Sequence, residues 1–211
     1  MQPSPNYVSV LFVHLLQPIF DLFELLERFD PKGPNEVQAG MVENGYAVSV
    51  VVLSALVIES AINRTRYVRN EPRRESAVDT LKRLGASELA DDIEEVFVLR
   101  DIIAHNHIWA AAIRWDNTSG MTLDSAEKLA AYGDQKFDRV VDPKTRATRR
   151  LNLDAFPNRI HRATAVTVLK KTVEALKYLE GLDRQYVYLS QPWHVARGKK
   201  LVPFYSWVDT L

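Results

Sequence analysis

The sequence contains no cysteine among its 211 residues. This absence excludes disulfide bonds, thiol nucleophiles and zinc sites that depend on cysteine ligands. Proteins of reducing compartments generally lack disulfides, so we expect the protein to be cytoplasmic.

The chain also lacks an excess of charge of either sign. Lysine and arginine number 27, as do aspartate and glutamate, so the formal net charge is +0. A nucleic-acid partner would therefore have to be held by a local basic patch rather than by the overall field. The hydrophobic fraction of 46% is ordinary, and the length is sufficient for one sizeable core.

Long uncharged runs are missing as well. The two longest candidates, residues 7–20 and 45–58, fall short of the ~20 apolar residues that a membrane span needs. The N-terminal segment lacks the basic region and the small-residue cleavage site of a signal peptide. We interpret both runs as core helices of a soluble protein and expect no membrane partner.

Helical periodicity dominates the first third of the chain. Apolar residues recur at helical spacing over residues 7–28, and Pro18 is expected to kink this helix. Residues 31–40 contain proline and glycine and predict a loop. A second long helix is expected from about residue 43 to residue 69.

Capping signals mark the helices that follow. Ser76 and Asp79 form a capping-box pattern that opens a short helix, which Gly85 ends. Ser87 can cap a fourth helix that runs to about Trp115. A last long helix is expected over residues 158–180.

The remaining segments are less regular. Residues 116–157 predict an insertion with a short helix near residues 124–132 and a β-hairpin around Asp142 and Pro143. The aromatic-rich tail, residues 183–211, reads as short strands or an extended arm. The predicted fold is therefore mainly α, a four- or five-helix bundle over residues 1–182 followed by a C-terminal extension.

The stretch VLRDIIAHNHIW, residues 98–109, carries the most informative polar residues. Arg100, Asp101, His105 and His107 interrupt an otherwise apolar run, and such groups are costly to bury unless they are paired. The stretch is apolar nearly all round the helix, which is more than one bundle can cover. We therefore expect a homodimer through the helix around residues 87–115.

The segment from Arg100 to His105 fits the pattern R-[N/D/H]-x3-H, and the chain resembles the HEPN superfamily of α-helical ribonucleases and nucleotide-binding domains. The preceding helix, which ends in ALVIESAINRTRYVR, is similar to the HEPN pattern too. The resemblance covers roughly residues 7–115 and 158–181. It leaves the insertion and the tail unaccounted for.

The resemblance implies a metal-independent endoribonuclease that needs no cofactor and acts at a cleft shared by two chains. Histidine can take a proton from a ribose 2′-OH and return one to the leaving 5′-oxygen, while arginine holds the phosphate. Such enzymes act as toxins or in antiphage defence, with an antitoxin or defence-system partner. A catalytically silent HEPN module that binds nucleotides or a partner protein is one alternative. An unrelated interaction domain, with an ion-pair network in this cluster, is another.

Two positions depart from the commoner HEPN pattern. His107 occupies the place of the tyrosine that accepts nucleotide modification in related toxins, and Asp101 replaces an asparagine. On a continuous helix, His107 would share the side of Arg100, whereas His105 would point about 140° away. In a dimer of crossing helices, Arg100 of one chain can still meet His105 of the other. We therefore assign catalysis to Arg100 and His105, with Asp101 orienting His105 one turn away.

Substrate binding is assigned to residues around this motif and to basic residues elsewhere. Lysine and arginine neutralise phosphates without reading sequence, and several lie near the end of the second long helix and in the insertion. The predicted RNA contacts are His107, Asn106, Arg64, Arg146, Arg149 and Arg150. His105 and His107 lack the i, i+4 spacing of a helical zinc pair, so no metal site is expected. The tail aromatics could stack on bases, but packing against the bundle is the favoured interpretation.

Overall fold

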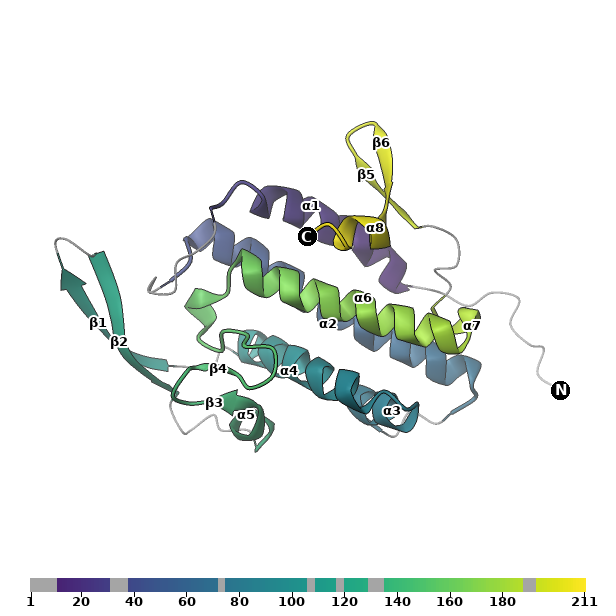
Figure 1. The fold of residues 1–211 in the computed structure, drawn as a ribbon, viewed down its shortest axis with the longest axis horizontal. Coiled ribbons are helices and arrows are strands. Elements are labelled where there is room, and N and C mark those ends of the chain that lie inside the picture. Colours follow the sequence, from purple (N-terminus) through teal and green to yellow (C-terminus); the bar gives the residue numbers. More distant parts are fainter. Residues whose placement is uncertain are drawn as a thin grey trace.

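The computed structural model describes residues 11–30, 38–71, 75–105, 109–116, 120–128, 135–187 and 193–211. This part of the protein is mainly helical, with small two-stranded antiparallel hairpins (Figure 1). Its longer helices are α1 (Leu16–Leu26), α2 (Met41–Val68), α4 (Ser87–Ala104) and α6 (Arg162–Leu182). The mainly α fold expected from the sequence periodicity is confirmed.

The helix α2 is the centre of the core, because it contacts α1, α4 and α6. Its side chains Val50, Ile58 and Ile62 are completely buried. By length and composition, α2 could cross a membrane, and half of its most apolar window is buried inside the protein. Core helices of soluble proteins pass the same test, and packing against three neighbouring helices is the arrangement of a core helix.

The first predicted helix is shorter than expected. A 3-10 turn (Leu11–Leu15) precedes α1, and residues 1–10 lie outside the described part of the chain. Pro18 is the third residue of α1, where its missing N–H costs no intrahelical hydrogen bond. The geometry changes from 3-10 to α just before the proline, in place of the predicted kink within a longer helix.

The short helix α3 (Ala77–Arg83) begins and ends at the predicted residues. Ser76 Oγ accepts a hydrogen bond from the Asp79 N–H at 3.1 Å, which confirms the cap. Gly85 follows the helix with φ +95°, a left-handed conformation that favours glycine. The second predicted cap is wrong, since Ala86 occupies the N-cap of α4 and Ser87 is its first residue.

The largest correction concerns the chain after α4. This helix ends at Ala104, and Trp109–Asp116 form strand β1, which pairs antiparallel with β2 (Gly120–Lys128). The predicted extension of α4 to Trp115 is therefore wrong, and so is the short helix near residues 124–132 over residues 124–128, which belong to β2; residues 129–132 lie outside the described part of the chain. Residues 110–112 are three alanines with high helix propensity, but the alternating pattern beyond them suits a strand. Figure 1 shows this hairpin projecting from the end of the helices.

The rest of the insertion lies against α4. The helix α5 (Gln135–Val140) leads into β3 (Val141–Asp142), which pairs with β4 (Ala147–Thr148), so the hairpin predicted around Asp142 is confirmed. A 3-10 turn (Pro157–Arg159) then precedes α6. The helix α6 begins four residues later than predicted and ends at Leu182, so Gly181 lies within its last turn.

Part of the C-terminal tail packs onto the helices, and its middle forms a hairpin that projects beyond α1 (Figure 1). Short strands, one of the two forms expected for the tail, are therefore present. The tail forms α7 (Arg184–Val187), the hairpin β5 (His194–Arg197) and β6 (Lys200–Pro203), and α8 (Phe204–Val208). The ring centroid of Trp207 lies 4.7 Å from that of Phe20 and 5.5 Å from that of Phe23. Phe204 and Trp207 are buried, which confirms the packing interpretation for these two aromatics.

Candidate active site

The predicted catalytic residues lie in the last turn of α4 and at its C-cap. The backbone N–H of His105 donates to the Asp101 carbonyl at 2.9 Å, and His105 then ends the helix. The His105 side chain is exposed. Asn106 and His107 lie outside the described residues. Because the helix stops at Ala104, the helical-wheel position predicted for His107 no longer applies.

Arg100 is held by ion pairs with two carboxylates. Its Nε lies 2.8 Å from Asp101 Oδ1, and its Nη1 lies 3.9 Å from Glu59 Oε2 on α2. The Nε makes no hydrogen bond, so its approach to Asp101 is a charge contact without hydrogen-bond alignment. The guanidinium also lies over the Phe97 ring, 5.5 Å from the centroid. Arg100 is therefore partly paired and partly accessible.

The carboxylate of Asp101 belongs to this ion pair and not to His105. Within the described residues, its charge partner is Arg100, and its link to His105 runs through the backbone only. The predicted orienting contact between the two side chains is not formed in this conformation. For Asp101 to orient the His105 ring, its side chain would have to adopt a different rotamer, or the Asp101 of a second chain would have to supply the contact.

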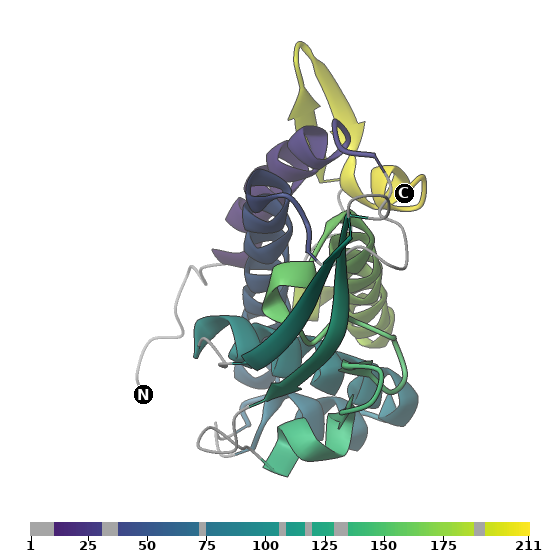
Figure 2. The ribbon, with the colours of Figure 1, turned by 90° about the vertical axis from the view of Figure 1, so that its left-hand side faces the viewer.

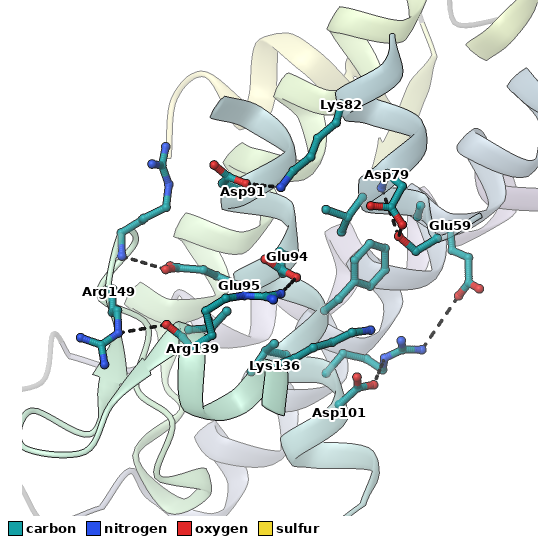
Figure 3. A pocket seen from close by; sticks show the side chains of 18 residues that line it. Glu59, Asp79, Lys82, Asp91, Glu94, Glu95, Asp101, Lys136, Arg139 and Arg149 are labelled. Atoms are coloured by element: carbon teal, nitrogen blue, oxygen red, sulfur yellow. Dashed lines mark hydrogen bonds and ion pairs between the residues drawn. The ribbon is translucent and has the colours of Figure 1, made fainter. Parts of the chain in front are cut away.

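A groove of about 750 Å³ runs along α4 and ends at Arg100 and Asp101. Its walls come from α3, α4, α5 and the segment after β4 (Figure 3). Acidic and basic side chains are equally represented; they are Glu59, Asp79, Asp91, Glu94, Glu95 and Asp101, and Lys82, Arg100, Lys136, Arg139, Arg149 and Arg150. Figure 3 shows Lys136 pointing toward the end that holds Asp101. His105 does not line this groove, so Arg100 and His105 face different surroundings within one chain.

Side chains in the middle of α4 bind the insertion (residues 116–157) through hydrogen bonds and ion pairs. Glu95 is buried, and its two carboxylate oxygens accept hydrogen bonds from the backbone N–H groups of Arg150 and Leu151, both at 2.8 Å. Arg150 Nε donates to Asp92 Oδ1 at 2.7 Å, and Lys171 Nζ from α6 lies 2.9 Å from Asp92 Oδ2. These contacts explain why α4 carries carboxylates in its interior turns. From the sequence, Asp92 is expected only to interact with the positive end of the α4 dipole, and Glu95 is a possible ion-pair partner of Arg100; nothing local indicates that either carboxylate binds the insertion.

The pKa of Asp92 follows from these neighbours. Burial raises the pKa of the carboxyl, but hydrogen bonds and charge attraction from Lys171 and Arg150 outweigh it, so the pKa is lowered overall. The same pair raises the pKa of Arg150 through its hydrogen bond to Asp92. Asp92 is therefore a charged anchor at neutral pH.

The remaining predicted RNA contacts are dispersed. Arg149 lines the groove, but its Nε donates to the Arg139 carbonyl at 3.0 Å and its Nη2 to the Val141 carbonyl at 3.2 Å. Arg146 has φ +60° and is half-buried beside β4, and Arg64 is half-buried on α2. Neither Arg64 nor Arg146 lines the groove. The structure thus brings Arg149 and Arg150 near one wall and leaves the other two apart.

Metal coordination has no evident site in the described part of the chain, where no three histidine or acidic side chains are grouped to hold an ion. Comparison with known proteins adds no assignment. No family model matches the sequence, and neither a curated protein nor a solved structure matches it.

Proposed function

We propose that the protein is a metal-independent endoribonuclease of the HEPN type, which cleaves RNA at a site shared by two copies of the chain. Arg100 is the observation that carries the proposal. It lies in the wall of a groove, and its guanidinium is held by ion pairs while its Nε makes no hydrogen bond. A phosphate could bind this guanidinium in place of the two carboxylates, because the planar, forked guanidinium can donate to two phosphate oxygens at once.

The chemistry divides between the two residue types. Arg100 would stabilise the charge that builds on the phosphate as the ribose 2′-oxygen attacks it. His105 would take the proton of the 2′-OH, and the equivalent histidine of the second copy would give one to the leaving 5′-oxygen. The products are a 2′,3′-cyclic phosphate and a free 5′-OH.

The positions of these residues favour a shared site over one within a single chain. Arg100 faces the groove, whereas His105 is exposed beyond the end of the helix and does not line it. A second chain could bring its His105 to the Arg100 of the first. The biological setting we propose is a toxin or antiphage-defence system, in which an antitoxin or another defence protein controls the activity.

The charge balance of the groove favours a second candidate, a catalytically silent HEPN module that binds a nucleotide or a partner protein. As many carboxylates as cations line the groove, and Arg100 already has two acidic partners. RNA must compete with these carboxylates for the cations, whereas a protein partner with mixed charges need not.

The test is cleavage of total RNA by the purified protein in EDTA, with chemical analysis of the fragment ends. We expect cleavage with 2′,3′-cyclic phosphate and 5′-OH ends, and a loss of about 10²–10³-fold in Arg100→Ala. Arg100→Lys is the matched variant that keeps the charge but not the fork. Cleavage that disappears on chelation would contradict the mechanism. A folded wild-type protein without cleavage would leave the silent module as the better account.

A further inference from the structure

The hairpin of β1 and β2 stands free of the helices along most of its length. Its base is anchored where the Trp109 ring packs edge-on against Phe137 and Phe156, at centroid distances of 6.1 Å and 5.8 Å. Beyond this base, β1 pairs only with β2 in the described structure, so the outer edges of both strands lack partners. Isolated two-stranded hairpins are marginally stable in water, and open edges invite pairing with other chains.

The two faces of the hairpin differ in chemistry. Ile113 lies opposite Leu123 and Trp115 opposite Met121, so these four apolar side chains share one face. Arg114 lies opposite Thr122 on the other face, where its Nη2 is 3.0 Å from Asp124 Oδ1. Arg114 and Asp124 therefore form an ion pair on the polar face, whereas the four apolar side chains of the other face carry no charge.

The apolar face is exposed where it projects furthest. Trp115 is 68% exposed, Ile113 50% and Met121 39%. Met41 and Val42, in the first turn of α2, are 89% and 53% exposed. That turn and the hairpin lie at the same end of the helices, and the hairpin crosses in front of this end in the second view (Figures 1 and 2). Half of the large exposed hydrophobic side chains of the described residues thus lie on two segments at one end of the helices.

We infer that this apolar end, defined by Met41, Val42, Ile113, Trp115 and Met121, binds a second copy of the same chain. A fully buried aromatic side chain contributes on the order of 150–250 Å² and aliphatic ones less, so the exposed parts of these five side chains amount to on the order of 500 Å² per copy. Two copies would bury about 1,000 Å² through these side chains alone, close to the lower end of specific interfaces, before any contact from the strand backbones. A patch without charge complements itself, as a two-fold interface requires.

The inference also changes which part of residues 87–115 forms the dimer. Val96, Leu99 and Ile102 on α4 are completely buried within their own chain, so they are not available to a partner. Among the described residues of this stretch, the exposed large hydrophobic side chains are instead those of Ile113 and Trp115 on β1. This dimer does not depend on the ribonuclease chemistry.

The first test measures the molar mass of the full chain by light scattering at micromolar concentration. We expect a dimer for the wild type and a monomer for the double variant Ile113→Ser/Trp115→Ser, with the melting temperature little changed. The control, Arg114→Ala/Thr122→Ala, changes the polar face and should stay dimeric. A monomeric wild type would overturn the inference. This holds even if the monomer binds a different protein through the same face. A double variant that stays dimeric would overturn it as well.

The second test uses the absence of cysteine, which makes any introduced thiol unique. Met121→Cys should give a covalent dimer with a short bismaleimide cross-linker, because Met121 lies on the apolar face. Thr122→Cys places the thiol on the opposite face and should cross-link much less. Equal cross-linking at both positions would contradict the proposed face even if the chain is dimeric. A dimer that does not cross-link through Met121→Cys contradicts this face and leaves the proposed function untouched, whereas a monomeric wild type contradicts the shared catalytic site as well.

Discussion

The middle and the end of α4 both carry charged side chains, but they use them differently. In the middle, Asp92 and Glu95 are buried, and each meets partners from the insertion at hydrogen-bond distance. In the last turn, Arg100 has two charge contacts, one of them 3.9 Å long, and His105 is exposed.

The difference separates a structural role from a binding role. Removing a buried carboxylate that accepts hydrogen bonds from backbone N–H groups leaves those groups unpaired, which lowers the free energy of unfolding. A half-exposed ion pair contributes little to stability and can exchange partners, since surface pairs are worth about 0–1 kcal/mol. Substitutions in the middle of α4 should therefore lower stability, and substitutions in its last turn should change binding or catalysis.

Glu95→Ala is expected to have the largest effect on stability. It leaves the part-buried amides of Arg150 and Leu151 without acceptors, at up to about 1–3 kcal/mol for each group. A decrease of about 2–4 kcal/mol in the free energy of unfolding would lower the melting temperature by roughly 5–15 °C. Glu94→Ala is the matched control, because Glu94 pairs with the exposed Arg139. Equal losses in the two variants, measured by thermal and urea unfolding, would contradict the distinction.

Acid should reveal a smaller contribution from Asp92. Its pKa is lowered in the folded protein, so its stabilising effect is complete above the ordinary aspartate pKa of about 3.9 and is lost as the pH falls toward the folded value. At neutral pH, Asp92→Asn should melt a few degrees below the wild type, and the difference should shrink below about pH 4. Asp91→Asn, which removes a carboxyl paired with Lys82 on the surface, is the control for loss of charge. A gap between Asp92→Asn and the wild type that stays constant down to pH 2 would show that the carboxylate charge is not responsible.

The sequence predicted the elements whose signals are local. The periodicity of α2, the cap at Ser76, the glycine after α3 and the turn at Asp142 were each sufficient to place an element. The end of α4 could not be placed, because no glycine or proline marks it and the alanines at 110–112 continue the helical pattern. The alternation of Ile113 and Trp115 with smaller or polar residues, followed by a glycine-containing turn, was the available signal for the hairpin.

The residue types of the candidate site could be predicted from the sequence, but the contacts between its side chains could not. The motif identifies Arg100 and His105, and Glu59, Glu94 and Glu95 are possible ion-pair partners of Arg100. The sequence cannot choose Glu59 among them or show that Asp101 pairs with Arg100 as well. It also cannot distinguish a basic residue that faces solvent from one that is committed to a carboxylate. Arg150 is the example, since its partner Asp92 is 58 residues away in the chain.

Complementation between two inactive variants tests the central claim, a site made from Arg100 of one chain and His105 of the other. Alone, Arg100→Ala should lose about 10²–10³-fold and His105→Ala about 10²–10⁴-fold in RNA cleavage rate, with unchanged melting temperatures. Co-refolded in equal amounts, half of the dimers combine the intact Arg100 of one chain with the intact His105 of the other. These heterodimers lack the second histidine, so the mixture should be more active than the separate variants but recover at most about a quarter of the wild-type rate. A mixture no more active than the sum of the separate variants would contradict the shared site, and full activity of His105→Ala would contradict the assignment itself.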